Sequence, residues 1–206
     1  MALGDPYIST EEAKLYLGIN LTKDDPLVAA AVVAASGWVT EYCQRDFNTA
    51  TAATARVYTP ASSYRCHVDD FSTTVGLVVK TDTNDDGVYD KTWTAADYVL
   101  KPHNGIEGGE SGFPYRTIIA VESPSFPCGT GRARVEVTAK WGWAAVPDKV
   151  KQATRILAAE VYRLKDAPLG IAGANDFGPL RVREVPQVAM MLSNFRHPAL
   201  TGPLVA

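Results

Sequence analysis

The stretch from Leu27 to Thr40 contains no charged side chain and consists mostly of alanine and valine. Asp24, Asp25 and Pro26 come directly before it and predict a helix start, because proline suits the first turn and acids complement the helix dipole there. We expect this helix to run to about Phe47. A helix that is apolar nearly all round must be buried nearly all round. The stretch therefore predicts either a helix that contacts other subunits as well as its own core, or the central helix of a self-contained bundle.

Helical spacing sorts the apolar residues of this helix into stripes. Our candidate subunit-interface residues are Leu27, Ala31, Val32, Ala35, Trp38, Val39 and Tyr42. The uncharged run from Pro26 to Thr40 is about five residues short of the roughly 20 that a membrane span needs, and no basic stretch followed by an apolar one opens the chain. We therefore expect no membrane partner and no signal peptide.

Two more helices flank a long segment of different pattern. Residues 9–12, Ser-Thr-Glu-Glu, have the spacing of a capping box and predict a short helix that ends at Gly18. The helical spacing of apolar residues begins again at Pro147-Asp148 and predicts another helix there. A last short helix is expected over residues 186–195. Between them, residues 55–143 show short stretches of period two separated by turn residues, which is typical of antiparallel strands.

The clearest strand pattern alternates over residues 133–141. Its expected inward residues are Ala133, Val135, Val137, Ala139 and Trp141, and its expected outward residues are Arg134, Glu136, Thr138 and Lys140. The fold class is therefore α+β. We expect a small helical bundle of two N-terminal helices, one long central-to-C-terminal helix and a short C-terminal helix, formed by residues 1–50 and 141–206, with an antiparallel β insertion at 51–140 between helices 2 and 3.

Charge and cysteine content exclude several classes of function. Three widely separated cysteines offer no disulfide framework and indicate free thiols in a reducing compartment. The net charge is −3, divided as −7 over residues 1–100 and +4 over 101–206. A pI of about 5.6 does not suit a nucleic-acid footprint. The division suits copies that pack against one another, although chance segregation would give the same pattern.

The sequence offers only weak candidates for chemistry. Oxygen ligands at Asp82, Asn84, Asp86 and Asp90, with Gly87, resemble a calcium loop, but Trp93 stands where an EF-hand needs its bidentate glutamate. A β-hairpin turn is the expected alternative, so we expect no metal site.

The histidines and cysteines show no nucleophile and base in a known arrangement, and the glycines form neither a dinucleotide site nor a P-loop. We therefore expect no catalytic residue and no cofactor. The side chains of Trp93 and Trp143 are expected to be open to solvent. With nearby carboxylates they would suit an alternative function, that of a carbohydrate-binding or hydrolytic β-rich domain. Its drawback is the lack of an export signal.

Several segments together resemble a known family. Residues 7–18 (YISTEEAKLYLG), an Ala-rich helix ending YCQRDF at 42–47, WGWAAVPDKVKQA at 141–153, YRLKDAPLG at 162–170 and GPLRVR at 178–183 are similar to head-to-tail connector (adaptor, head-completion) proteins of long-tailed bacteriophages. The similarity covers about half of the chain. The segment from about 50 to 140 is the departure, since compact helical members lack or shorten it.

The resemblance implies a structural virion protein without a substrate. Such a protein is assembled in the host cytoplasm into a ring, usually of twelve subunits, under the portal protein at the head–tail interface. It meets the next tail-side connector (stopper or tail terminator), and genomic DNA passes through its channel without sequence-specific binding.

The C-terminal segment is our candidate for docking on the portal. It is net basic and ends in an apolar cluster that we expect to be exposed. The docking candidates are Arg181, Arg183, Met190, Met191, Leu192, Phe195 and Arg196. Methionines beside an aromatic anchor suit a groove on a partner. The alternative is that this short helix caps the core of its own subunit.

Overall fold

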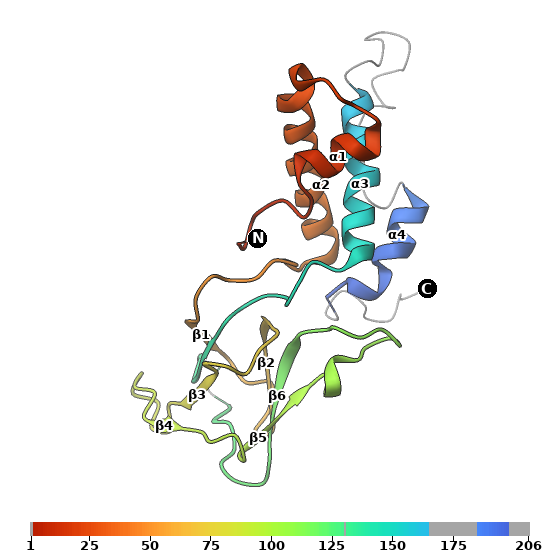
Figure 1. Ribbon diagram of the computed structural model, residues 1–206. Coiled ribbons are helices and arrows are strands. Elements are labelled where there is room, and N and C mark those ends of the chain that lie inside the picture. The colour runs from red at the N-terminus through yellow and green to blue at the C-terminus, as the bar shows by residue number, and fades with distance from the viewer. Residues whose placement is uncertain (1, 130, 165–184, 198–206) are drawn as a thin grey trace. The chain divides into compact units, whose positions relative to one another are not determined.

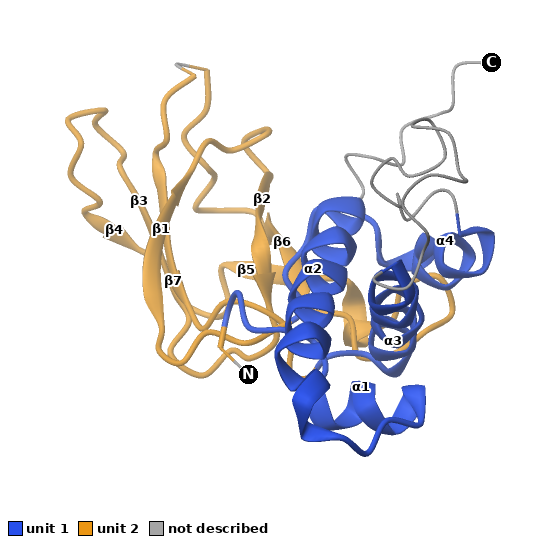
Figure 2. Ribbon diagram, turned by 90° about the horizontal axis from the view of Figure 1, so that it is seen from above, with its two compact units in different colours: residues 1, 3–47, 146–206 blue, residues 2, 48–145 orange. Residues whose placement is uncertain are grey.

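The computed structural model describes residues 2–129, 131–164 and 185–197, and its fold class is α+β (Figure 1). The chain divides into two compact units (Figure 2). Unit 1 comprises residues 1, 3–47 and 146–206, and unit 2 comprises residues 2 and 48–145. From the sequence we expected these boundaries after residues 50 and 140.

Helix α1 of unit 1 spans Thr10–Leu17. The capping box is confirmed: the Ser9 hydroxyl accepts the Glu12 backbone N–H at 3.1 Å, and the Glu12 carboxylate accepts the Ser9 N–H at 2.8 Å. Gly18, in the left-handed conformation with φ 70°, ends the helix as expected.

A 3₁₀ turn, η1 (Thr22–Asp24), leads into α2 (Asp25–Cys43). The helix ends before Phe47 because Gln44 takes a left-handed conformation with φ 53°. One face of α2 is buried in unit 1, and its members are Val28, Ala31, Val32, Ala35, Ser36, Val39 and Cys43. By length and composition the segment Thr22–Cys43 would suffice to cross a bilayer, a test that the core helix of a soluble protein also passes. Within unit 1 its buried face packs against α1 and α3.

Helix α3 (Asp148–Arg163) packs along α2 and runs in the opposite direction (Figure 1). Its apolar stripe includes Val150, Ala153 and Leu157, all fully buried. Arg155 binds the Glu12 carboxylate at 3.0 Å and so ties α3 to α1. Helix α4 (Pro186–Leu192) packs against α3 and continues into the 3₁₀ turn η5 (Ser193–Phe195).

Unit 2 contains two antiparallel sheets. One has the strand order β1-β7-β3-β4, and the other has the order β2-β6-β5. The strands are β1 (Thr54–Tyr58), β2 (Arg65–Phe71), β3 (Val78–Thr81), β4 (Lys91–Thr92), β5 (Tyr98–Lys101), β6 (Tyr115–Ala120) and β7 (Val135–Ala139), with a 3₁₀ turn η2 (His103–Gly105) after β5. Apolar side chains from β2, β3, β6 and β7 form one core cluster.

The alternation expected for residues 133–141 holds from Val135 onward, because Val135, Val137, Ala139 and Trp141 are all buried. It is wrong at the start of the stretch, where Ala133 is exposed and Arg134 is buried. The reason is a polar contact: Arg134 Nε donates to the backbone carbonyl of Asp82 at 3.0 Å. A hydrogen-bonded guanidinium can be buried where an unpaired one cannot.

The two segments through which the chain enters and leaves unit 2 are bonded to each other. Ala50 N–H donates to the Trp141 carbonyl at 2.7 Å, and Trp143 N–H donates to the Asn48 carbonyl at 3.0 Å. Gly142 lies between these bonds, with φ 103°, and its own N–H donates to the Asp70 carbonyl at 2.6 Å. We call residues 48–50 and 141–143 the junction clamp.

Candidate assembly surfaces

The predicted interface residues of α2 do not share one surface. Ala31, Val32, Ala35 and Val39 are buried within unit 1, so they serve the core of their own subunit, as the self-contained alternative required. Trp38 and Tyr42 are half-buried. Leu27 is 51% exposed and lies on the opposite face of the helix.

That opposite face is the part of α2 that sequence reasoning missed. Its exposed residues follow helical spacing: Leu27, Ala30, Val33, Gly37 and Glu41. We call these five residues the α2 outer face. Val33 is 59% exposed, and the first charge on this face is Glu41. The signal that could have found it is the i, i+3, i+7 spacing counted from Ala30 rather than from Ala31.

The expected exposure of the C-terminal cluster is wrong for two residues. Leu192 and Phe195 are buried, and the Phe195 ring meets Phe47 edge-on with 6.0 Å between centroids. Backbone bonding adds to this, since His197 N–H donates to the carbonyl of Cys43, the last residue of α2, at 2.8 Å. The turn η5 therefore completes the core of unit 1, and His197, which follows it, caps α2.

Other members of the docking set lie at the surface or outside the described residues. Met190 is 72% exposed, and Met191 is half-buried. Arg196 is also half-buried, with its guanidinium 5.2 Å from the centre of the Tyr42 ring. Arg181 and Arg183 lie outside the described residues.

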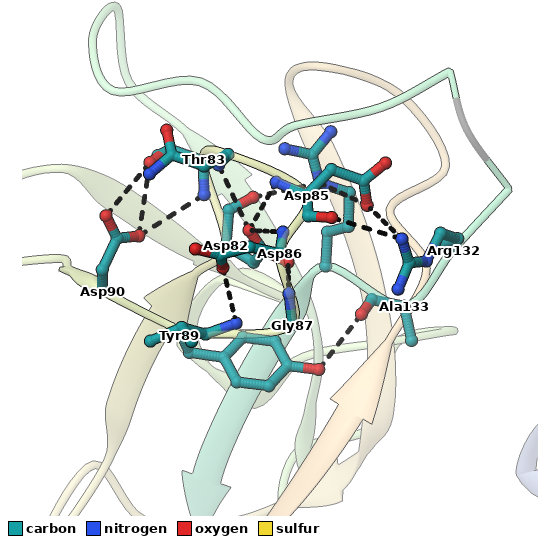
Figure 3. A network of polar contacts seen from close by, with 12 residues as sticks. Asp82, Thr83, Asp85, Asp86, Gly87, Tyr89, Asp90, Arg132 and Ala133 are labelled. Atoms are coloured by element: carbon teal, nitrogen blue, oxygen red, sulfur yellow. Dashed lines mark hydrogen bonds and ion pairs between the residues drawn. The ribbon is translucent and has the colours of Figure 1, made fainter.

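The loop from Asp82 to Asp90 joins β3 to β4, which pair antiparallel, so the hairpin interpretation of this segment is confirmed. Four backbone N–H groups, those of residues 84–87, donate to the buried Asp82 carboxylate at 2.7–3.3 Å (Figure 3). Desolvation raises the pKa of Asp82, but the donors from Gly87, Asp85 and Asp86 outweigh it and hold this pKa below its usual value.

Two of the other expected calcium ligands, Asp86 and Asp90, also bond within the loop. Asp86 accepts the Val88 N–H at 2.8 Å, and Asp90 accepts the Thr83 N–H and hydroxyl at 3.2–3.4 Å (Figure 3). Across residues 2–129, 131–164 and 185–197, no three His, Cys, Asp or Glu side chains gather as a metal site would require. The carboxylates fold the loop, which is the usual role of aspartate in a hairpin turn.

The expectation that Trp93 and Trp143 are open is wrong. Trp93 stacks on Phe126 with 4.4 Å between ring centres and donates from Nε1 to the Thr81 hydroxyl at 3.1 Å. Trp143 donates from Nε1 to the Asp70 carboxylate at 3.1 Å. Both rings are buried, so neither offers a face on which a sugar could stack.

The buried thiols are unsuited to nucleophilic chemistry. Desolvation raises the pKa of Cys43 and of Cys66 to about 12, so both remain protonated at neutral pH. His67, the sequence neighbour of Cys66, has its Nδ1 3.2 Å from the Thr117 hydroxyl. The third thiol, Cys128, is exposed.

Chains in structures of gene transfer agent (GTA) particles share this fold. No family model matches the chain, and no curated protein matches it. A chain in a structure described as the neck of an empty GTA particle, computed with C6 symmetry, is 18% identical with a TM-score of 0.54, and the match covers 92% of this chain and 89% of that one. A chain in the virion of a native gene transfer agent (GTA) particle is also 18% identical, with a TM-score of 0.53 and coverage of 95% and 92%. The likeness shows a common fold along nearly the whole of both chains.

Proposed function

We propose that this chain is a structural protein of the neck of a phage-like particle, a subunit of the head-to-tail adaptor ring between the portal and the tail. The observation that carries the proposal is the fold shared with a neck chain over 92% of this sequence, with the β-rich unit included. The segments that resemble phage connectors come from both ends of the same chain. The β segment, which departs from compact connectors, thus has a counterpart in a particle protein.

The mechanism of such a protein is geometric and needs no turnover. A head-to-tail contact between unlike surfaces of neighbouring copies closes into a ring when the rotation per copy divides a full turn. We propose a ring of twelve, as the connector resemblance implies. The net charge of −3 suits a channel through which DNA passes without adhering, because like charges repel.

We propose two protein partners for the ring, the portal on the head side and the next connector on the tail side. Since Leu192 and Phe195 serve the core, Met190, Met191 and Arg196 are the described residues left for portal docking. Arg181 and Arg183 complete the basic set, because guanidinium groups suit acidic partner surfaces. The carbohydrate alternative loses its support with the burial of Trp93 and Trp143.

The proposal is tested by removing the protein from its particle. Inactivating its gene is expected to yield DNA-filled heads without tails, and supplying the protein in trans is expected to restore tailed particles. Electron microscopy of the lysate measures both outcomes. Tailed, infectious or transducing particles in the absence of the protein would contradict the adaptor role.

A further inference from the structure

The sheet β2-β6-β5 has one face in the core of unit 2 and one face away from it. Cys66 and Ile118, which are paired in register, lie in the core cluster. Successive residues of a strand point to opposite faces of the sheet. The register therefore assigns to the other face Arg65 and His67 of β2, Thr117 and Ile119 of β6, and Val99 and Lys101 of β5. We call these six residues the basic sheet face.

Two cations of the basic sheet face are exposed and have no ion-pair partner among the described residues. They are Arg65 and Lys101. Five other basic side chains of unit 2 lie 3.7 Å or less from a carboxylate oxygen, namely Arg56, Lys80, Arg116, Arg132 and Arg134. Asp69, two residues beyond His67 on β2, is itself bound by Arg56 at 2.5 Å. None of the six positions of the face is acidic, although residues 48–145 have eleven acidic and nine basic side chains.

The basic sheet face also has an apolar part. Val99 is 39% exposed, and Ile119, its partner in the register, is half-buried. Arg65 stands opposite Ile119 on the other side of β6. Charge complementarity sets which surfaces associate, because a like charge in the same place would repel. Cations around an apolar centre suit a partner surface on which acids surround an apolar side chain.

The loop between β3 and β4 has that arrangement. Val88 is 58% exposed and lies in sequence between Asp86 and Asp90, which are also exposed. Asp85 binds Arg132 at 3.2 Å, whereas Asp86 and Asp90 bond only to N–H and hydroxyl groups of the loop and have no ion-pair partner in the described part of the chain (Figure 3). We call Asp86, Val88 and Asp90 the acidic loop tip.

The spacings of the charges are compatible. With strands about 4.8 Å apart and about 3.4 Å per residue, the Cα atoms of Arg65 and Lys101 are about 12 Å apart across the sheet. Asp86 and Asp90 are four residues apart, so their Cα atoms are separated by at most about 14 Å. One loop tip can therefore reach both cations of one face.

The two surfaces lie on opposite sides of unit 2. The core cluster contains residues of both sheets, so the basic sheet face points away from the sheet to which β3 and β4 belong. Figures 1 and 2 both show β3 and β4 on one side of this unit and β2, β5 and β6 on the other. The loop of a copy is thus directed away from its own basic sheet face and toward a neighbour.

We propose that the acidic loop tip of one copy docks on the basic sheet face of the next copy of this chain. In this contact Val88 packs against the neighbour's Val99 and Ile119, and the two carboxylates of the tip pair with the neighbour's two unpaired cations. The surfaces are unlike and belong to one chain, as a head-to-tail contact requires. The inference rests on the proposed ring and gives the β-rich unit a part in closing it.

Charge reversal tests the contact from both sides. Arg65→Glu with Lys101→Glu is expected to lower the yield of tailed particles about tenfold or more, because like charges would meet in the contact. Asp86→Lys with Asp90→Lys is expected to have the same effect. A chain with all four changes is expected to recover to within about threefold of the wild type. The matched control is Lys23→Glu with Lys149→Glu, which reverses two exposed lysines of unit 1 and is expected to leave the yield unchanged.

Melting curves of the purified variants separate failed assembly from failed folding. If each pair of changes lowered the yield and the fourfold variant, folded, did not recover, the basic sheet face would belong to a different partner and the inference would be overturned. Wild-type yields from both pairs would overturn it as well.

Paired cysteines give a second measurement that leaves the charges unchanged. In a Cys128→Ser background, which leaves only the buried Cys43 and Cys66, Val88→Cys with Val99→Cys is expected to give a ladder of disulfide-linked oligomers when assembled particles are oxidised. Val88→Cys with Val75→Cys, at an exposed valine outside the face, is expected to give none. Tailed particles without the first ladder, or with equal ladders from both pairs, would overturn the inference while leaving the adaptor role intact.

Discussion

Replacing Gly142 by alanine is expected to open the junction clamp. A Cβ at this position would overlap the backbone carbonyl oxygen of Asn48 and would lie 2.9 Å from its carbonyl carbon and 3.1 Å from the Thr49 Cα. Relieving the overlap costs about 1–3 kcal/mol. The φ of 103° adds about 1–2 kcal/mol for a residue with a side chain. Weakening the hydrogen bonds on either side of Gly142 adds about 1 kcal/mol.

The sum is about 3–6 kcal/mol, which for a chain of this length lowers the melting temperature by roughly 10–20 °C. Thermal unfolding followed by circular dichroism measures it. Gly129→Ala is the matched control, because Gly129 has nearly the same φ, 106°, and open space around its Cβ position. The Gly129→Ala substitution has only the cost of the positive φ and is expected to lower the melting temperature by a few degrees. If the two variants had the same melting temperature, the close approach of residues 48–49 to Gly142 would be refuted.

Other predictions separate core from surface. Phe195→Ala is expected to lower the free energy of unfolding by about 3–5 kcal/mol, whereas Met190→Ala, at an exposed residue, is expected to change it by no more than about 0.5 kcal/mol. Equal effects of the two substitutions in denaturant titrations would show that Phe195 is exposed. Val32→Glu places an unpaired charge in the core and is expected to prevent soluble expression, and a folded variant that fails only in assembly would contradict the burial of Val32. The lowered pKa of Asp82 stabilises the fold above about pH 4 and ceases to do so as the pH falls through that pKa. Asp82→Asn is therefore expected to melt below the wild type at pH 7, with the difference shrinking as the pH falls through the lowered pKa. Calcium and chelators are expected to leave the melting temperature of the wild type unchanged, and a rise with calcium would contradict the hairpin account.

Features that depend on local chemistry could be predicted from the sequence. The capping box at Ser9 and the turn of the Asp82 loop each follow from a few neighbouring residues, and the structure has both. The alternation of β7 follows equally from its own residues.

The misassignments concern residues whose surroundings come from distant parts of the chain. Trp93 is buried by Phe126, and Phe195 is buried against Phe47. Arg134 is drawn inward by the carbonyl of Asp82, 52 residues earlier. No local pattern encodes these contacts, so the tryptophans and the C-terminal cluster were expected at the surface. The exposed side of α2 was missed for a related reason, since composition shows that the helix is apolar but not which face α3 covers.

The central claim is that this chain forms a ring at the junction of head and tail. The most direct measurement is a cryo-electron microscopy reconstruction of the neck of the particle that contains this protein, without symmetry imposed at the start. The account predicts a closed ring of copies directly beneath the portal, with density for both units of each copy. Density for this chain elsewhere in the particle, or a single copy at the neck, would contradict it.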